Sequence, residues 1–402
     1  MGFKALCLGL LFVLFVSYIY KPIPENVEES WKVLALDVPL KILSLMAIYF
    51  EKLGIINYAE FISIIAKLDY TQPHSDEYLT VTDMAFADIP VRLYLPKRKS
   101  EIPRRAVIYV HGGAFCFGSF KMRIYDSMNR WTANKLDAVV VSVDYGLAPK
   151  HKFPVAFEDV LTAVKFFLQD KILTKYGVDP TRIGVAGDSS GCALLAAVTQ
   201  QIQNDPEIKH KIKAQVFIYP VLQIIDSFLP SYREYEHGIF LTRDRAVKLV
   251  SLYVFGNDEA FYQAIKRNQY MPLESKHLFK FVNWSILLPE KYRKNHVYTE
   301  PILGRPGYSF PALMDNRASP LLANDSQLKN LPLTYILTCE YDILRDDGLM
   351  FVSRLRNVGV PVTHDHVENG FHAALLFMMP PFYLRLGFRI RDMYNSWLDK
   401  NL

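Results

Sequence analysis

The stretch Arg182–Ala196, with the sequence RIGVAGDSSGCALLA, decides the fold of this chain. Its first residues form a short apolar run that predicts a strand, and residues 192–198 are apolar over a helical length. Between them lies a G-x-S-x-G pattern, which is typical of a serine on a sharp turn from strand to helix. The residues two before and two after such a serine come close together, so a side chain there would clash. Only Ser189 has glycine at both positions, and it is therefore the candidate nucleophile.

Composition and charge narrow the class of protein. The 402 residues are 50% hydrophobic and 22% charged, which predicts a globular chain with a large core. The net charge of +5 is spread along the chain without a long basic run, so we expect no nucleic-acid partner. The four cysteines form no C-x-x-C motif and no cluster with histidine at metal-ligand spacing. We therefore expect no metal and no other cofactor.

Apolar strand-like runs alternate with helical patterns through most of the chain. Besides the central stretch, strands are predicted within 78–96, 105–113, 138–144, 216–220, 331–339 and 360–367, and helices within 25–68, 154–168, 343–357 and 381–398. This alternation predicts an α/β fold whose mostly parallel sheet is covered by helices on both faces. Residues 221–325 break the rhythm and are rich in Tyr, Phe and Leu, so we expect them to form a cap over the sheet.

The first 20 residues, MGFKALCLGLLFVLFVSYIY, have Lys4 as their only charge and are then almost wholly apolar. A cleaved signal peptide has this pattern, but it also ends in small residues, and Ser17 is the only one near this end. We favour a short uncleaved anchor, which would keep Lys4 in the cytosol and place the body of the chain in the lumen. Both interpretations direct the chain into the secretory pathway.

The expected organisation has five parts. These are an N-terminal signal anchor or signal peptide (1–20), an N-terminal helical cap segment (21–77), a first part of the α/β core (78–220), a cap insertion (221–325) and a second part of the core (326–402).

Three candidate catalytic residues follow separate predicted strands in the order Ser189, Asp342, His372. In an open α/β sheet the carboxyl ends of the strands converge on one crevice, so the three side chains can meet. His372 would take the proton of the Ser189 hydroxyl, and Asp342 would orient the imidazole. His364 and His366 lie within a strand, and we expect them to be structural.

An oxyanion hole is predicted beside the nucleophile. A glycine pair at the end of a strand lets backbone amides point at a developing negative charge. The candidate residues are His111, Gly112, Gly113, Ala114 and Ser190.

Five motifs, in order along the chain, carry a resemblance to a known family. They are HGG at 111–113, DYGLAP at 144–149, GDSSG at 187–191, YDILRDDG at 341–348 and NGFH at 369–372. Together they resemble the hormone-sensitive-lipase branch of the α/β hydrolases, and nearly the whole chain is similar to the arylacetamide deacetylase family. The resemblance implies an α/β-hydrolase fold with an eight-stranded sheet and a helical cap.

The resemblance also implies an activity and a location. The activity is that of a serine esterase or deacetylase, which cleaves hydrophobic carboxylic esters or acetylated aryl amides through an acyl-enzyme on Ser189. The location is the membrane of the endoplasmic reticulum, with a single-pass N-terminal segment and a lumenal catalytic domain; secretion is the alternative. The expected partners are thus a small hydrophobic substrate and that membrane. A disulfide between Cys116 and Cys339 is implied in the same way.

Three positions depart from the family pattern. Ala114 and Cys192 stand where the family usually has glycine, and Gly146 stands where it usually has arginine. These departures leave open an alternative, in which the chain is a catalytically weak member that binds lipid-like ligands.

Two N-x-[ST] sequons occur, at Asn283 and Asn324. If the body of the chain is lumenal, we expect at least one of them to carry a glycan.

Overall fold

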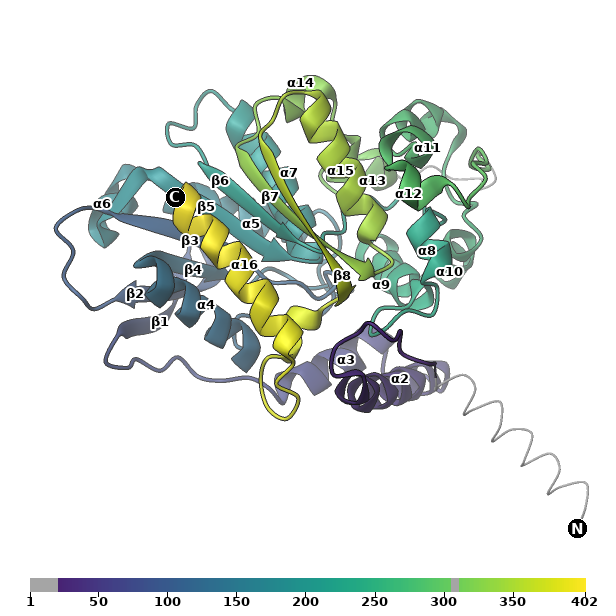
Figure 1. Ribbon diagram of the computed structural model, residues 1–402, viewed down its shortest axis with the longest axis horizontal. Helices are drawn as coiled ribbons and strands as arrows, with labels where there is room; N and C mark the ends of the chain where they lie inside the picture. The colour runs from purple at the N-terminus through teal and green to yellow at the C-terminus, as the bar shows by residue number, and fades with distance from the viewer. Residues whose placement is uncertain (1–20, 305–310) are drawn as a thin grey trace, which may run out of the picture.

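The computed structural model describes residues 21–304 and 311–402, which are organised around one eight-stranded sheet (Figure 1). The strands are β1 (Leu79–Phe86), β2 (Ile89–Pro96), β3 (Arg104–Val110), β4 (Val139–Val143), β5 (Val178–Asp188), β6 (Ala214–Ile218), β7 (Leu333–Tyr341) and β8 (Val362–Phe371). Their order in the sheet is β1-β2-β4-β3-β5-β6-β7-β8. β2 pairs antiparallel with both β1 and β4, and the remaining neighbours are parallel. The predicted eight-stranded, mostly parallel sheet is confirmed.

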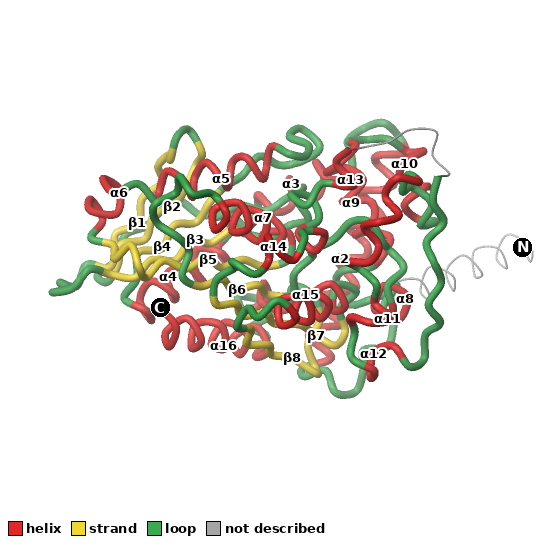
Figure 2. Tube along the Cα trace, turned by 90° about the horizontal axis from the view of Figure 1, so that it is seen from above, coloured by secondary structure: helices red, strands yellow, loops and turns green. Residues whose placement is uncertain are grey.

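Helices cover both faces of the sheet (Figure 2). One face packs against α5 (Val155–Phe167), α7 (Ser190–Asn204) and α15 (Arg345–Asn357), and the other packs against α4 (Arg123–Leu136) and α16 (Arg385–Asn401). The short helix α6 (Asp170–Tyr176) precedes β5.

Strand β3 shows how the sequence divides between the two faces. Ala106, Ile108 and Val110 belong to the hydrophobic cluster under α5 and α7, whereas Val107 and Tyr109 belong to the cluster under α4 and α16. Because alternate side chains of a strand point to opposite faces, a continuous apolar run is what a sheet buried on both sides requires.

Short helices fill the segment between β6 and β7. They are α8 (Pro230–Glu234), α9 (Arg243–Phe255), α10 (Glu259–Lys266), η1 (Leu273–Phe281), α11 (Trp284–Leu287), α12 (Glu290–Arg293), α13 (Pro311–Met314), η2 (Pro320–Leu322) and α14 (Asp325–Leu328). No strand interrupts them in the described part of this segment.

Two helices precede the first strand of the sheet, α2 (Ser30–Lys52) and α3 (Tyr58–Lys67), and they lie side by side below α9 and α10 in Figure 1. Within the described residues, α2 is the one helix that is long and apolar enough to cross a membrane, by length and composition alone. The anchor or signal peptide predicted at 1–20 lies outside the described residues.

Candidate active site

Ser189 sits on a strained turn between β5 and α7. Its φ of 53° and ψ of −120° fall outside the regions that residues with side chains usually occupy. A Cβ atom on Gly187 would lie 2.9 Å from the Val110 carbonyl oxygen, and one on Gly191 would overlap that oxygen outright. The two glycines are therefore required by the close approach of β3, which adds to the steric reason that the sequence suggested.

The three predicted catalytic side chains meet at the carboxyl end of the sheet. Ser189 Oγ lies 3.0 Å from His372 Nε2, and His372 Nδ1 lies 2.9 Å from Asp342 Oδ2. Asp342 follows β7 directly and His372 follows β8 directly. The second carboxylate oxygen of Asp342 accepts a 2.8 Å hydrogen bond from the Leu344 amide, which fixes the acid in place. All three catalytic side chains are buried, so water screens their interactions little.

The two strand histidines have structural partners. His364 Nε2 and His366 Nδ1 each lie 2.9 Å from the hydroxyl oxygen of Thr338, and His366 Nε2 lies 2.9 Å from Glu340. Burial, together with the neighbouring His366, lowers the pKa of His364 to about 4. These side chains therefore brace β7 against β8 and contact neither Ser189 nor Asp342.

The five predicted oxyanion residues differ in the hydrogen bonds that they make within the protein. The Gly112 N–H donates to Asp188 Oδ1 at 2.9 Å, so it is occupied. The His111 ring stacks on Tyr145, and its Nδ1 lies 2.7 Å from the Gly112 carbonyl oxygen. Across the described chain, the N–H groups of Gly113, Ala114 and Ser190 find no protein acceptor. These three amides are the available oxyanion donors.

Asp188 is a site residue that the sequence reasoning missed. Its buried carboxylate accepts from the Gly112 N–H and, at 3.0 Å, from the Tyr109 hydroxyl, while the Tyr125 hydroxyl donates to its other oxygen at 3.2 Å. Burial raises the pKa of Asp188 above its ordinary value. Because Asp188 precedes Ser189, this carboxylate ties the HGG loop to the nucleophile turn. Its position inside the GDSSG motif was the only available hint.

The Ser190 side chain makes a second tie. Its hydroxyl oxygen accepts a 3.3 Å hydrogen bond from the Phe115 N–H. The residue after the nucleophile therefore holds the oxyanion loop with its side chain and leaves its own amide available.

A small apolar cavity of about 50 Å³ adjoins Ser189. Ala114, Phe115, Val221 and Leu241 are among its walls. Ala114 has a φ of 51°, in the left-handed region that favours glycine, so the alanine here is strained and its methyl group borders the cavity.

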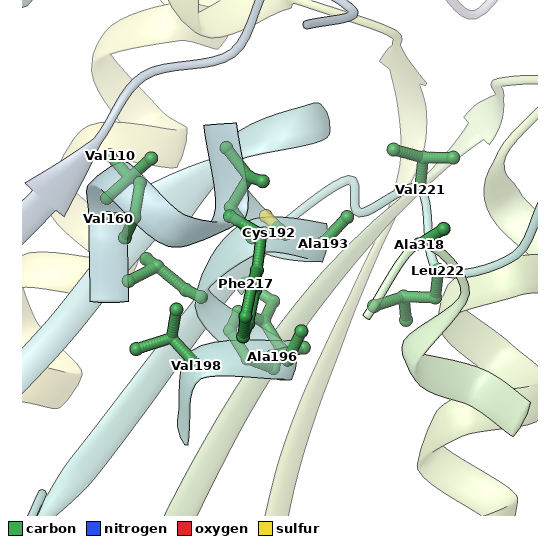
Figure 3. Close-up of a cluster of buried hydrophobic side chains, with 14 of the residues drawn as sticks. Val110, Val160, Cys192, Ala193, Ala196, Val198, Phe217, Val221, Leu222 and Ala318 are labelled. Carbon is green, nitrogen blue, oxygen red and sulfur yellow. The ribbon is translucent and has the colours of Figure 1, made fainter. Parts of the chain in front are cut away.

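The other two departures from the family pattern fit their surroundings. Cys192 is fully buried on the inner side of α7 near Phe217 (Figure 3), and its thiol donates to the Gly187 carbonyl oxygen at 3.1 Å. The Gly146 N–H donates to Asp159 Oδ2 at 2.7 Å. Neither position disturbs the three catalytic side chains.

The expected disulfide between Cys116 and Cys339 is not formed, and the structure corrects it. Both cysteines are free and buried. The Cys116 thiol donates to the Leu249 carbonyl oxygen at 3.5 Å and belongs to the cluster under α5 and α7. Cys339 belongs to the cluster under α4 and α16, so the two thiols pack on opposite faces of the sheet.

The two sequons differ in accessibility. Asn324 is exposed, caps α14, and accepts a 2.6 Å hydrogen bond from the Ser326 hydroxyl of its own sequon. Asn283 is half-buried and caps the short helix α11. Asn324 is therefore the more accessible acceptor.

Comparison with known proteins agrees with this site. A sequence model described as the α/β hydrolase fold matches residues 107–277 and 291–376. The chain is 72% identical to human (Homo sapiens) arylacetamide deacetylase-like 2, with both chains covered in full. It is 50% identical to mouse (Mus musculus) arylacetamide deacetylase over 99% of this chain and 100% of the relative. The chain belongs to the arylacetamide deacetylase family of α/β hydrolases. It is also 39% identical to bovine (Bos taurus) neutral cholesterol ester hydrolase 1 over 98% of both chains.

Solved structures extend the likeness to esterases. The thermostable carboxylesterase EstE1 from a metagenomic library aligns with a TM-score of 0.61 at 26% identity, covering 86% of this chain and 95% of that one. An esterase from Pyrobaculum calidifontis aligns with a TM-score of 0.63 at 26% identity, covering 91% and 97%. With the family membership and the Ser189–His372–Asp342 contacts, these likenesses make the chain a serine ester hydrolase.

Proposed function

We propose that this chain hydrolyses hydrophobic carboxylic esters or acetylated aryl amides through an acyl-enzyme on Ser189. The observation that carries the proposal is the continuous pair of hydrogen bonds from Ser189 through His372 to Asp342, beside an apolar cavity. A serine hydroxyl is a weak nucleophile until an adjacent base removes its proton, and this geometry supplies such a base.

The roles follow from the atoms in contact. His372 Nε2 takes the proton as Ser189 Oγ attacks the substrate carbonyl, and then gives it to the leaving alcohol or amine. Asp342 accepts from His372 Nδ1, which holds the imidazole in the required tautomer and stabilises its charged form. Water then attacks the acyl-enzyme by the same route and releases the carboxylic acid and free Ser189.

The amides of Gly113, Ala114 and Ser190 are proposed to receive the negative oxygen of each tetrahedral intermediate. Removing one such donor from a serine hydrolase typically costs about 10²–10³ in rate. Asp188 acts indirectly. Its carboxylate accepts the Gly112 N–H, and this hydrogen bond orients the amides of the next two residues, Gly113 and Ala114.

The substrate class draws on two observations. The walls of the Ser189 cavity are mainly apolar, which favours hydrophobic acyl groups over charged ones. The relatives carry the names arylacetamide deacetylase and neutral cholesterol ester hydrolase, which supports amide and ester substrates with apolar bodies.

We also propose a location at the membrane of the endoplasmic reticulum, with the catalytic domain in the lumen. The apolar sequence of residues 1–20 supports an anchor or signal sequence, and secretion is the outcome if that segment is cleaved.

A second candidate is a catalytically weak chain that binds lipid-like ligands. The strained Ala114, which borders the cavity and stands where the family usually has glycine, is the observation that favours it.

A chain-length series of p-nitrophenyl esters, run beside acetylated aryl amides, separates the two candidates. An esterase or deacetylase turns these substrates over, and Ser189→Ala reduces the rate by about 10³-fold or more. Binding of the esters without turnover in the wild-type chain would favour the weak ligand binder and reject hydrolysis.

A further inference from the structure

Helix α2 exposes an apolar stripe on its outer face and buries two charged residues on its inner face. Exposed apolar residues recur every three or four positions along one face, at Trp31, Ala35, Pro39, Ile42, Met46, Tyr49 and Leu53, which follows α2. Trp31 is 70% exposed and Tyr49 is 61% exposed. In a protein surrounded by water, the outer face of such a helix is normally polar and only the inner face is apolar.

The inner face of α2 buries apolar and polar residues together, and the polar ones hold the helix against the protein. Asp37 and Lys41 are buried and form an ion pair there. Asp37 Oδ1 also accepts a 3.0 Å hydrogen bond from the Phe240 N–H, and Arg245 donates to the Ser44 hydroxyl at 3.1 Å. These contacts hold the inner face of α2 against the rest of the protein. The apolar stripe on its outer face therefore remains exposed at the surface of the molecule.

Two features indicate that a lipid surface covers this stripe. The described chain begins at Lys21, nine positions before α2, and the preceding residues 1–20 have the composition of a membrane segment. The stripe also has Trp31 near one end and Tyr49 near the other, and these two residue types favour the boundary between water and hydrocarbon. An exposed apolar face that follows a membrane segment so closely is suited to lie in the same bilayer surface.

A second apolar cavity lies behind α2, next to the cavity at Ser189. Its volume is about 300 Å³, and Leu43 of α2 and Ile62 of α3 are among its walls. Phe117, three residues past Ala114, and Leu376, four residues past His372, also line it. Leu241 lines both this cavity and the one at Ser189. The larger cavity is therefore adjacent to the cavity at Ser189.

We propose that the exposed stripe of α2 rests in the surface of a lipid bilayer, and that the cavity behind α2 and α3 admits apolar substrates from it. The docking of α2 rests on the stripe and on the apolar residues 1–20, whereas the entry of substrate also rests on the proposed hydrolase function.

Tryptophan quenching by brominated lipid tests the docking. The chain has four tryptophans, and residues 1–20 contain none, so the N-terminal segment gives no signal of its own. The full chain is reconstituted in phosphatidylcholine vesicles whose acyl chains carry bromine near the headgroup. We expect bromine to quench the wild-type emission and Trp31→Phe to abolish that quenching. Trp131→Phe is the matched control, because Trp131 is 41% exposed on α4 and should leave the quenching intact. Full quenching in Trp31→Phe, or none in the wild type, overturns the docking.

A kinetic comparison tests the entry of substrate. Met46→Glu and Tyr49→Glu place charge in the stripe, so we expect kcat/KM to fall at least about fivefold for a long-chain ester dissolved in the vesicles. Hydrolysis of p-nitrophenyl acetate in water should stay within about twofold, because that substrate needs no bilayer. Ile102→Glu, at another exposed apolar residue, is the control and should change neither rate. An unchanged rate on the vesicle ester, or an equal fall on both substrates, overturns the entry route.

Failure of the membrane docking can be told apart from failure of the proposed hydrolase function. Ser189→Ala should keep the Trp31 quenching while it loses hydrolysis of both esters. If the wild-type chain is quenched but hydrolyses neither ester, the proposed function fails and the docking stands.

Discussion

Ala114 holds a backbone conformation that costs alanine free energy. Its φ of 51° lies in the left-handed region, where a Cβ atom crowds the backbone and glycine does not. The residue also borders the Ser189 cavity and carries one of the proposed oxyanion amides. The strain is therefore located where it can affect both stability and the acyl site.

Replacing this alanine by glycine should improve both properties. We expect Ala114→Gly to stabilise the chain by up to about 1 kcal/mol, which raises Tm by about 1 °C for a protein of this size. Removal of the methyl group should also raise kcat/KM severalfold for the longer acyl groups of a p-nitrophenyl ester series. Differential scanning calorimetry and the ester series measure the two effects.

Ala87 provides the matched control for that variant. It has a φ of 47° in the turn between β1 and β2, away from Ser189. Ala87→Gly should give a comparable gain in Tm with unchanged kinetics. A gain in rate from Ala87→Gly, or no change in either property from Ala114→Gly, would contradict the account of the strain.

At the level of single residues, the sequence predicted a site residue correctly where a motif requires one particular backbone geometry. The G-x-S-x-G pattern identified Ser189, and the glycines needed on either side of it match the approach of Val110. The anchoring of Gly112 by Asp188 could not be foreseen, because Tyr109 and Tyr125, the other partners of this carboxylate, come from distant positions. The cysteine pairing failed for a related reason, since the end of a strand does not reveal which face its side chain occupies.

At the level of elements, helix α15 positions the segment after β6. Asp347 Oδ2 accepts from the N–H groups of Leu222, at 2.9 Å, and Gln223, at 3.3 Å, and Asp347 Oδ1 accepts from the Gln223 side chain at 3.1 Å. Gln223 lines the cavity at Ser189. Burial raises the pKa of Asp347 to about 8, well above the ordinary value of 3.8.

This raised pKa predicts a loss of stability as the pH increases. The carboxyl group favours the folded state below about pH 4, and that contribution disappears as the pH rises through about 8, because the unfolded chain releases the proton first. Asp347→Asn keeps an acceptor for both backbone amides and cannot ionise. Its Tm should therefore fall less between pH 5 and pH 8 than the Tm of the wild type.

The exposed Asp88→Asn is the control for this measurement and should keep the wild-type pH dependence. Parallel curves for Asp347→Asn and the wild type would mean that Asp347 does not hold its proton in the folded chain.

The order of most elements could be read from the apolar periodicity, and their ends less well. Strand β8 continues to Phe371, four residues beyond the predicted end, because Tyr341 of β7 still pairs with it there. Helix α4 was overlooked, since its buried face contains the polar residues Asp126, Asn129 and Thr132, which interrupt the apolar pattern. The walls of the Ser189 cavity come from separated segments of the chain, and periodicity within one segment cannot assemble them.

At the level of the whole molecule, the proposed lumenal location can be read from glycosylation. Asn324 is exposed and Asn283 is half-buried, so Asn324 is the expected acceptor in a lumenal chain. We expect glycosidase treatment of the chain from mammalian cells to increase its electrophoretic mobility. Asn324→Gln should remove most of that shift, and Asn283→Gln should leave most of it. A wild-type chain without any shift would argue against the lumenal location.

The central claim for the whole molecule is that it is a serine hydrolase acting through Ser189, and covalent labelling by a fluorophosphonate probe tests it most directly. The probe reacts with a serine only when an adjacent base has activated it. We predict a single adduct, assigned by peptide mass spectrometry to Ser189, that is absent in Ser189→Ala and strongly reduced in His372→Ala. His364→Ala, at the histidine bound to Thr338, should label like the wild type. An unlabelled wild-type chain, or equal labelling of Ser189→Ala, would contradict the claim.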